Sequence, residues 1–252
     1  MRIFDFHLHP GYDFHAPALD HATFTGRLKE DGIVKCAGSF AGKDCRNLPI
    51  AQYAQLIPEY NRSIWDFHDL EPDFLVPGIH IHPDHVDMSA AELQKHHEKG
   101  GTLVGELVHY MMGWNYSHPG LLPLLDYARE LDMVVSIHPT SDFASLERIM
   151  DNVPGLKLVL AHLSGYGLYD RTLEFMKKYE TVYTDLSAHG TDFDTTVADA
   201  VNKIGSHRIL YGTDYPGYKS RPFIDIVLNA PIREEEKENI FYNNAAALLK
   251  TV

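Results

Sequence analysis

The stretch Ile3-Phe4-Asp5-Phe6-His7-Leu8-His9 is an apolar, strand-like run that ends in two residues of a metal-ligand type. Four more apolar runs along the chain end in the same way, in Glu106, His138, His162 and Asp214. In a barrel of parallel strands all strands end on one face, so residues far apart in the sequence can meet there. The sequence therefore predicts one small volume that gathers four imidazoles and two carboxylates.

Strand-like runs alternate with helical stretches along the whole chain. The expected strands are residues 2–6, 33–38, 74–79, 102–107, 133–137, 157–161, 181–186 and 208–212. The expected helices are residues 50–67, 89–99, 120–131, 142–151, 169–178, 193–204, 219–228 and 233–249. Near-continuous apolar strands separated by helices are typical of a parallel sheet covered by helices. The pattern predicts an α/β fold, a TIM (β/α)8 barrel in a single domain over residues 1–252.

The composition is that of an ordinary globular protein, with 44% hydrophobic and 23% charged residues. No apolar run approaches the ~20 residues that a membrane span needs. The formal charge of −13 argues against nucleic acid as the natural partner, because nucleic-acid binders need a basic face. We therefore expect a small-molecule substrate, no nucleic acid and no membrane. The sequence leaves the oligomeric state open, a homo-oligomer included.

The start of the chain and its cysteines favour a cytoplasmic protein. A strand begins within two residues of Met1, with no basic and apolar leader before it. Two cysteines, Cys36 and Cys45, suit a reducing compartment, and no CxxC zinc pattern exists.

The donor types in the predicted cluster suit a divalent metal. His7 and His9 are two apart at a strand end, so both side chains lie on one side, with Asp5 one step deeper to orient a histidine. The plainer alternative is that this His-x-His motif only marks the start of a loop. Imidazole and carboxylate together suit zinc, manganese or iron. We expect one or two divalent metals per chain, with zinc foremost.

Three residues decide the chemistry. Asp214 is expected to bind metal and to accept the proton of a metal-activated water, although a helix cap before Pro216 is the alternative. Glu106 lies in an apolar strand and needs a cation or a hydrogen-bond partner. It either bridges two metals, which we favour, or supports a histidine beside one metal. His162 is then a ligand of the second metal or, with one metal, a general acid/base.

Loops after the strands carry the residues expected to contact substrate. Segments 10–30 and 109–119 are expected to fold over the mouth of the barrel and shape a pocket. The substrate-binding candidates are His80, His82, His109, Tyr215 and Arg221, with Lys219 beside the last. Ordinary solvent-exposed side chains are the alternative for each. His96 and His97, on a predicted helix, are expected at the surface.

Taken together, these motifs resemble those of the amidohydrolase superfamily, and within it the amidohydrolase-2 group. The segments that carry the resemblance are residues 5–9, 137–139, 159–165, 212–216 and 239–248. It implies a first metal on His7, His9 and Asp214, a bridge by Glu106, and a second metal on His138 and His162. At the fourth strand, Gly105-Glu106 is more similar to a Gly-Glu pair of TatD-type hydrolases than to the amidohydrolase-2 decarboxylases. The segment Gly78-Ile79-His80 also resembles the TatD-type branch.

The resemblance implies a metal-dependent hydrolase that cleaves an ester, amide, lactone or phosphoester bond of a small molecule. The first alternative is a mononuclear decarboxylase or hydratase, a lyase of the same superfamily. The second is a TatD-like deoxyribonuclease, against which the net charge argues. A metal-binding scaffold without turnover and a PHP-type phosphoesterase are weaker alternatives. Two metals per chain would favour hydrolysis, and one metal would favour the lyase.

Overall fold

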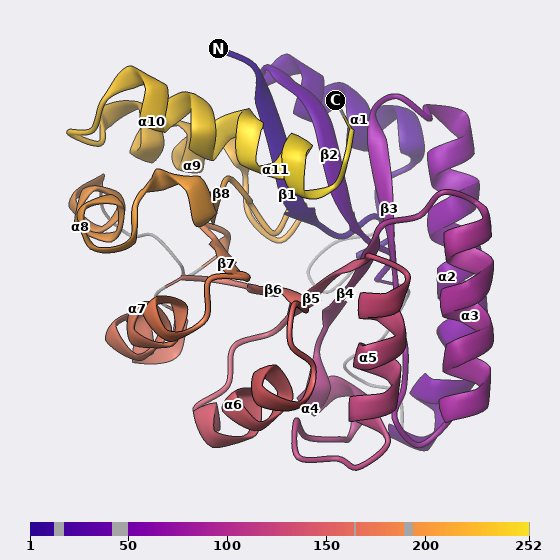
Figure 1. The fold of residues 1–252 in the computed structure, drawn as a ribbon. Helices are drawn as coiled ribbons and strands as arrows, with labels where there is room; N and C mark the ends of the chain where they lie inside the picture. Colours follow the sequence, from indigo (N-terminus) through magenta and orange to yellow (C-terminus); the bar gives the residue numbers. More distant parts are fainter. Residues whose placement is uncertain (13–17, 42–49, 164, 189–193, 252) are drawn as a thin grey trace.

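A computed structural model describes residues 1–12, 18–41, 50–163, 165–188 and 194–251. Its sheet runs in chain order from β1 to β8, and every neighbouring pair is parallel. The strands are β1 (Ile3–Leu8), β2 (Ile33–Ser39), β3 (Leu75–Ile79), β4 (Leu103–Leu107), β5 (Val134–Ile137), β6 (Lys157–Leu160), β7 (Val182–Asp185) and β8 (Ile209–Leu210). Beyond β8 the chain closes on β1, where the backbone N–H of Phe6 donates to the Tyr211 carbonyl at 2.9 Å. The predicted TIM barrel in a single domain is confirmed (Figure 1).

Helices form the outer layer of the barrel (Figure 1). They are α1 (His21–Glu30), α2 (Ile50–Leu70), α3 (Val86–Glu98), α4 (His109–Met112), α5 (Leu121–Glu130), α6 (Phe143–Asn152), α7 (Tyr169–Lys178), α8 (Asp194–Ile204), α9 (Ser220–Asn229), α10 (Glu234–Glu238) and α11 (Asn244–Leu248). The π-helical turn η4 (Asn239–Asn243) joins the last two. Within the described part of the chain, no helix combines the length and apolarity needed to cross a bilayer.

Helix α1 is the main element that the sequence pattern missed. It lies in the segment expected to be a loop, and Asp20 caps its first turn by accepting the Thr23 backbone N–H at 2.9 Å. Only Phe24, Thr25 and Leu28 are buried on its inner face. So short an apolar stripe gives a weak periodic signal. Cys36 is buried and free, and Cys45 lies outside the described residues.

One end of the barrel is filled by apolar side chains. Phe4 and Phe6 of β1 belong to a buried cluster with Leu210 of β8 and with Ala245 and Leu248 of α11. Figure 1 shows α11 across the end of the barrel at which β1 begins. The polar residues predicted to form the site therefore gather at the other end, where the strands finish.

Candidate metal centre

Glu106, at the end of β4, lies at the centre of the predicted cluster. Its Oε2 atom lies 3.5 Å from His7 Nε2 and 3.5 Å from His9 Nε2. The Asp214 Oδ1 atom lies 3.4 Å from His9 Nε2, and the two histidine Nε2 atoms are 3.2 Å apart. We call His7, His9, Asp214 and the Oε2 atom of Glu106 the first half-site.

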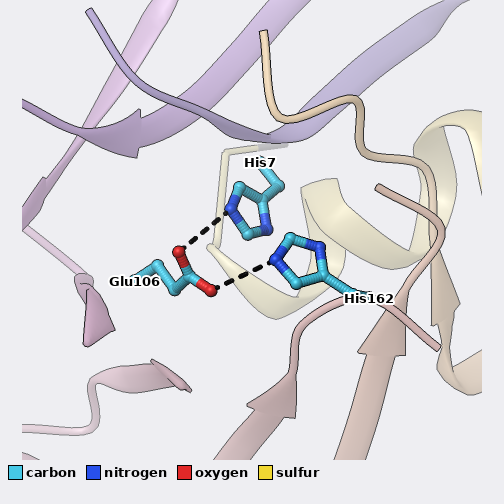
Figure 2. A group of neighbouring side chains, drawn as sticks. All are labelled: His7, Glu106 and His162. Atoms are coloured by element: carbon cyan, nitrogen blue, oxygen red, sulfur yellow. Dashed lines mark ion pairs between the residues drawn. The ribbon is translucent and has the colours of Figure 1, made fainter. Parts of the chain in front are cut away.

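The other oxygen of Glu106 faces two further histidines. Its Oε1 atom lies 2.8 Å from His138 Nδ1, after β5, and 3.5 Å from His162 Nε2, after β6. Figure 2 shows His7 and His162 approaching different oxygens of the same carboxylate. We call His138, His162 and the Oε1 atom of Glu106 the second half-site. All six residues predicted as ligands therefore meet in one volume.

Hydrogen bonds outside the cluster fix the protonation of three imidazoles. His7 Nδ1 donates to Asp185 Oδ2 at 2.8 Å, and His9 Nδ1 donates to the Ser39 carbonyl at 3.1 Å. A carboxylate or carbonyl oxygen can only accept, so in the neutral imidazoles Nδ1 carries the proton and Nε2 is a bare acceptor. His162 Nδ1 is held in the same way by the Ser187 carbonyl at 3.2 Å, and it also lies 2.8 Å from Ser187 Oγ.

The first half-site has the donors and spacing of a divalent-metal site. With neutral imidazoles, two Nε2 atoms that can only accept and two carboxylates converge there, and such a buried set of acceptors needs a bound cation. Donors on one metal at bond lengths of ~2.1 Å lie roughly 3.0–3.4 Å apart, close to the 3.2–3.5 Å found. The residues present therefore fit a divalent metal, with His7, His9, Asp214 and Glu106 as its holders.

Electrostatics in the cluster favour bound cations, protons included. Burial opposes charge on His7, yet Asp185 and Glu106 raise the pKa of this imidazole well above its usual value. Burial likewise raises the pKa of Glu106, but the stronger combined pull of His138 and His7 leaves it well below the usual range. The pKa of Asp185 falls to about 2 against its burial, chiefly through His7. Protons and a metal therefore compete for these donors.

The backbone is unusual at three positions of the cluster. His162 and Asp214 have φ angles of +58° and +65°, in the left-handed region that costs non-glycine residues about 1–3 kcal/mol. Gly105, before Glu106, has φ +99°, and a Cβ atom there would lie 2.1 Å from the Ser136 carbonyl oxygen. Only glycine fits at that position, so Gly105 is needed for the backbone conformation that precedes Glu106.

The sequence led us to expect that Asp5 orients an imidazole. Asp5 lies beside the site but, among the residues that the structure describes, makes no side-chain contact of that kind. Its Oδ2 atom accepts the Thr213 hydroxyl at 2.6 Å, and its Oδ1 atom accepts the backbone N–H groups of Thr213 and His7 at 3.1 and 3.2 Å. Asp5 thereby ties the strand that carries His7 to the segment that carries Asp214. Its burial raises the pKa of this carboxyl to about 7.

Two residues at the end of β7 and just beyond it belong to the site although the sequence did not single them out. Asp185 contacts His7, and Ser187 contacts both His7 and His162. The signal was available, because the seventh strand ends in an acidic residue just as the fourth does. It was overlooked because aspartate at a strand end is also common in turns and caps.

The second His-x-His motif, after β3, contacts surrounding loops. His80 Nε2 lies 3.0 Å from the Phe40 carbonyl, and burial lowers the pKa of this imidazole to about 4. His82 Nε2 lies 2.9 Å from the Met112 carbonyl, while His82 Nδ1 accepts the Asp84 backbone N–H at 3.2 Å. Both histidines are buried. Their contact with a substrate stays a prediction.

An open cleft of about 740 Å³ lies beside the cluster. Its lining residues are His109, Tyr110, His138, Pro139, Thr140, Ser141 and Leu168. His138 therefore joins cleft and cluster, since it also contacts Glu106. Burial lowers the pKa of His109 to about 4, so this imidazole is neutral at pH 7. The segment 109–119 shapes the cleft as the sequence predicted.

The side chains of the remaining candidates form none of these contacts, although the Tyr215 carbonyl accepts the His9 backbone N–H at 2.8 Å. Tyr215 is buried with its ring 4.9 Å from that of Phe24. Arg221 is exposed and forms an ion pair with Asp225 of the same helix at 3.0 Å, and its neighbour Lys219 is exposed. Their roles in substrate binding stay predictions.

His96 was wrongly expected at the surface. It is 1% exposed, and its Nδ1 atom accepts the Trp65 indole N–H at 3.1 Å. His97 is exposed as expected. Gly101 makes room for the buried ring, since a Cβ atom there would lie 2.2 Å from it.

Solved structures share this fold at low sequence identity. A 2,6-dihydroxybenzoate decarboxylase from Rhizobium has a TM-score of 0.80 and 17% identity, covering 99% of this chain and 98% of its own. A dihydroxybenzoic acid decarboxylase from Polaromonas, with bound manganese, has a TM-score of 0.72 and 15% identity, covering 99% and 96%. A protein from Pseudomonas putida described as a 2-pyrone-4,6-dicarboxylic acid hydrolase has a TM-score of 0.72 and 17% identity, covering 98% and 97%.

Sequence comparisons identify the family. A search of curated proteins found no match. Neither this search nor the structural comparison supports the expected TatD-like feature at the fourth strand. The amidohydrolase family model (Amidohydro_2) matches residues 47–251, which is most of the chain. The protein belongs to the amidohydrolase family, as the motifs at its strand ends predicted.

Proposed function

We propose that the protein is a metal-dependent lyase, which removes carbon dioxide from a small carboxylated substrate or adds water to such a substrate. The observation that carries this proposal is the asymmetry of the two half-sites. In the first half-site the donor atoms of His7, His9 and Asp214 form one mutually close group, and Glu106 Oε2 lies 3.5 Å from the Nε2 atom of both histidines. In the second, the 2.8 Å between His138 Nδ1 and Glu106 Oε1 is a hydrogen-bond distance, shorter than two ligands of one ion adopt. This arrangement supports one metal per chain.

The comparisons support the lyase over the hydrolase that the sequence favoured. Among the similar structures, decarboxylases of hydroxylated aromatic acids predominate. Three of these decarboxylase structures contain manganese, so manganese stands beside zinc as the proposed metal. A divalent metal held by His7, His9, Asp214 and Glu106 would supply a Lewis acid that polarises substrate oxygens.

The residues of the chain account for binding and for proton transfer. A decarboxylation breaks one C–C bond, and the carbon left behind must take up one proton. The His138–Glu106 pair holds a proton beside the cleft, where a substrate would lie. Asp214, with 22% of its side chain exposed, is the most open carboxylate of the cluster, and it stays our candidate for proton exchange together with His162.

A cytoplasmic location of the protein stays a prediction.

Isotope labelling tests the reaction type. Protein loaded separately with zinc and manganese is incubated with 2,6-dihydroxybenzoate, 5-carboxyvanillate and 2-pyrone-4,6-dicarboxylate, the compounds named for the similar enzymes. A decarboxylase releases carbon dioxide and, in D₂O, places deuterium on the vacated carbon. A hydrolase releases no carbon dioxide and places ¹⁸O in the carboxyl or phosphate group left by bond cleavage, whereas a hydratase places ¹⁸O in a new hydroxyl group on an intact substrate. The Asp214→Asn variant is the matched control for turnover at the proposed site.

Hydrolysis with two metals is the second candidate, because Glu106 directs its two oxygens to two sets of histidines. The Pseudomonas putida structure is described as a hydrolase of the same fold. Elemental analysis of protein saturated with each metal decides between the candidates. One metal per chain supports the lyase, and two metals per chain with ¹⁸O incorporation would replace it with the hydrolase.

A further inference from the structure

Asp185 and Ser187 form a buried polar unit that contacts both half-sites. Asp185 is the last residue of β7, and Ser187 follows two positions later. Both side chains are fully buried. Asp185 directs Oδ2 to His7 and Oδ1 to Ser187, and Ser187 directs its Oγ to His162. One continuous set of hydrogen bonds therefore joins a histidine of the first half-site to a histidine of the second.

The donors around Asp185 leave only one arrangement of protons. Its Oδ1 atom accepts the backbone N–H of His162 at 3.1 Å and that of Ser187 at 2.9 Å, and it also accepts the Ser187 hydroxyl. Because the Ser187 proton points to Asp185, the Ser187 oxygen is an acceptor for His162 Nδ1 at 2.8 Å. The Oδ2 atom remains for the Nδ1–H of His7. Both imidazoles then present a bare Nε2 atom to Glu106.

We infer that Asp185 and Ser187 are positioning residues that set the tautomer and the ring orientation of His7 and His162 together. The rings of these two histidines lie 5.0 Å apart at 27°, so a rotation of one would press on the other. A unit that holds both rings from behind keeps their Nε2 atoms on the two oxygens of Glu106. The inference rests on the metal site of the proposed function but not on the type of reaction.

Replacing the carboxylate by a carboxamide gives the sharpest test. In Asp185→Asn the amide oxygen must take the Oδ1 place, because three donors converge there. The amide NH₂ then faces His7 Nδ1, and it forces the proton of that imidazole onto Nε2, where it blocks a metal. Removing an outer partner of a ligand typically costs roughly 10–100-fold in metal affinity, and a wrong tautomer costs more. We expect at least about a 100-fold loss for Asp185→Asn.

Variants of Ser187 separate the hydroxyl from the carboxylate. Ser187→Ala should weaken binding of zinc or manganese about tenfold, and Ser187→Thr should restore it because the hydroxyl returns. Thr184→Val is the matched control, since this buried hydroxyl of β7 donates to the Leu160 carbonyl and is not part of the site. Metal affinity is measured by competition with a chelating dye, without any substrate.

Nitrogen NMR of the unmutated, metal-free protein, at a pH high enough to leave both imidazoles neutral, gives a test that no folding defect can spoil. Spectra recorded with ¹⁵N-labelled histidine should assign a proton to Nδ1 of both His7 and His162. Unchanged metal affinity in Asp185→Asn and Ser187→Ala, or an unprotonated Nδ1 on either histidine, would overturn the inference and leave the proposed metal site standing. Failure of the unmutated protein to bind any metal would instead overturn the proposed function.

Discussion

The chain contains two His-x-His motifs of the same form, and they have different fates. His7-Leu8-His9 ends β1, and His80-Ile81-His82 follows β3. Both pairs are buried. In the first pair the outer nitrogens are held by Asp185 and Ser39, so the Nε2 atoms face each other at 3.2 Å. In the second pair the Nε2 atoms lie against the backbone carbonyls of Phe40, after β2, and Met112, in α4.

The difference teaches that a histidine becomes a candidate ligand through the partner of its other nitrogen. A hydrogen bond on Nδ1 leaves Nε2 free for a metal, as in the first pair. His82 instead joins the loop after β3 to α4 with its Nε2 atom and uses Nδ1 for its own turn. The first motif is therefore the candidate pair of metal ligands, and the second holds the segments that carry Phe40 and Met112.

The largest effect should come from Asp214, the carboxylate that completes the first half-site. Asp214→Asn removes a charge and a proton carrier, so kcat should fall about 10³-fold while the fold is kept. Turnover measured by carbon dioxide release, with circular dichroism as the control for folding, checks this. A variant with wild-type turnover would show that Asp214 has been given the wrong role.

Matched substitutions in the two motifs test the comparison directly. His9→Gln should lower the affinity for manganese or zinc by at least roughly 100-fold, because a ligand is lost. His82→Gln should leave metal content unchanged and lower the free energy of unfolding by about 1–2 kcal/mol, through lost hydrogen bonds. Elemental analysis and urea unfolding are the measurements. Equal loss of metal in both variants would show that the two motifs do not differ in metal binding.

Glu106 tests whether the two half-sites hold one metal or two. With one metal, Glu106→Gln should keep the stoichiometry at one and weaken affinity roughly 10–100-fold, since one negative charge is removed. A calorimetric titration of metal-free protein with the metal measures both the stoichiometry and the affinity. A change in stoichiometry from two to one would show instead that this carboxylate bridges.

The smallest effect concerns a buried histidine far from any metal chemistry. Burial lowers the pKa of His96 to about 3, whereas the unfolded chain has an ordinary value of about 6.5. Its contribution to stability is therefore complete above pH 6.5 and is lost progressively as the pH falls toward 3. Between pH 7 and pH 5.5 the loss should be about 1 kcal/mol.

Comparison of two adjacent histidines isolates that contribution. His96→Gln should make the free energy of unfolding less sensitive to pH in this range, because no proton is taken up at residue 96 on unfolding. His97→Gln, at the exposed neighbouring position, is the control and should leave the pH profile as it is. Identical profiles for the two variants would contradict the burial argument.

The sequence by itself determined the barrel and the members of the cluster. Parallel strands buried on both faces produce continuous apolar runs, and a ligand-type residue at the end of such a run stands out. Glu106 was conspicuous for that reason, and so were His7, His9, His138, His162 and Asp214. Helix α1 escaped because its apolar stripe is short, and Asp185 escaped because an aspartate at a strand end has common structural uses.

Only the tertiary structure decided what each donor atom does. The spacing is the same in His7-Leu8-His9 and His80-Ile81-His82, so it could not show which oxygens lie behind each ring. It could not show that Asp5 accepts a hydrogen bond from Thr213, where the end of the sheet meets its beginning. Nor could it show that His96 accepts one from Trp65. Hydrogen bonds between residues distant in the chain depend on distances of a few tenths of an ångström, and only packing of the whole barrel sets these.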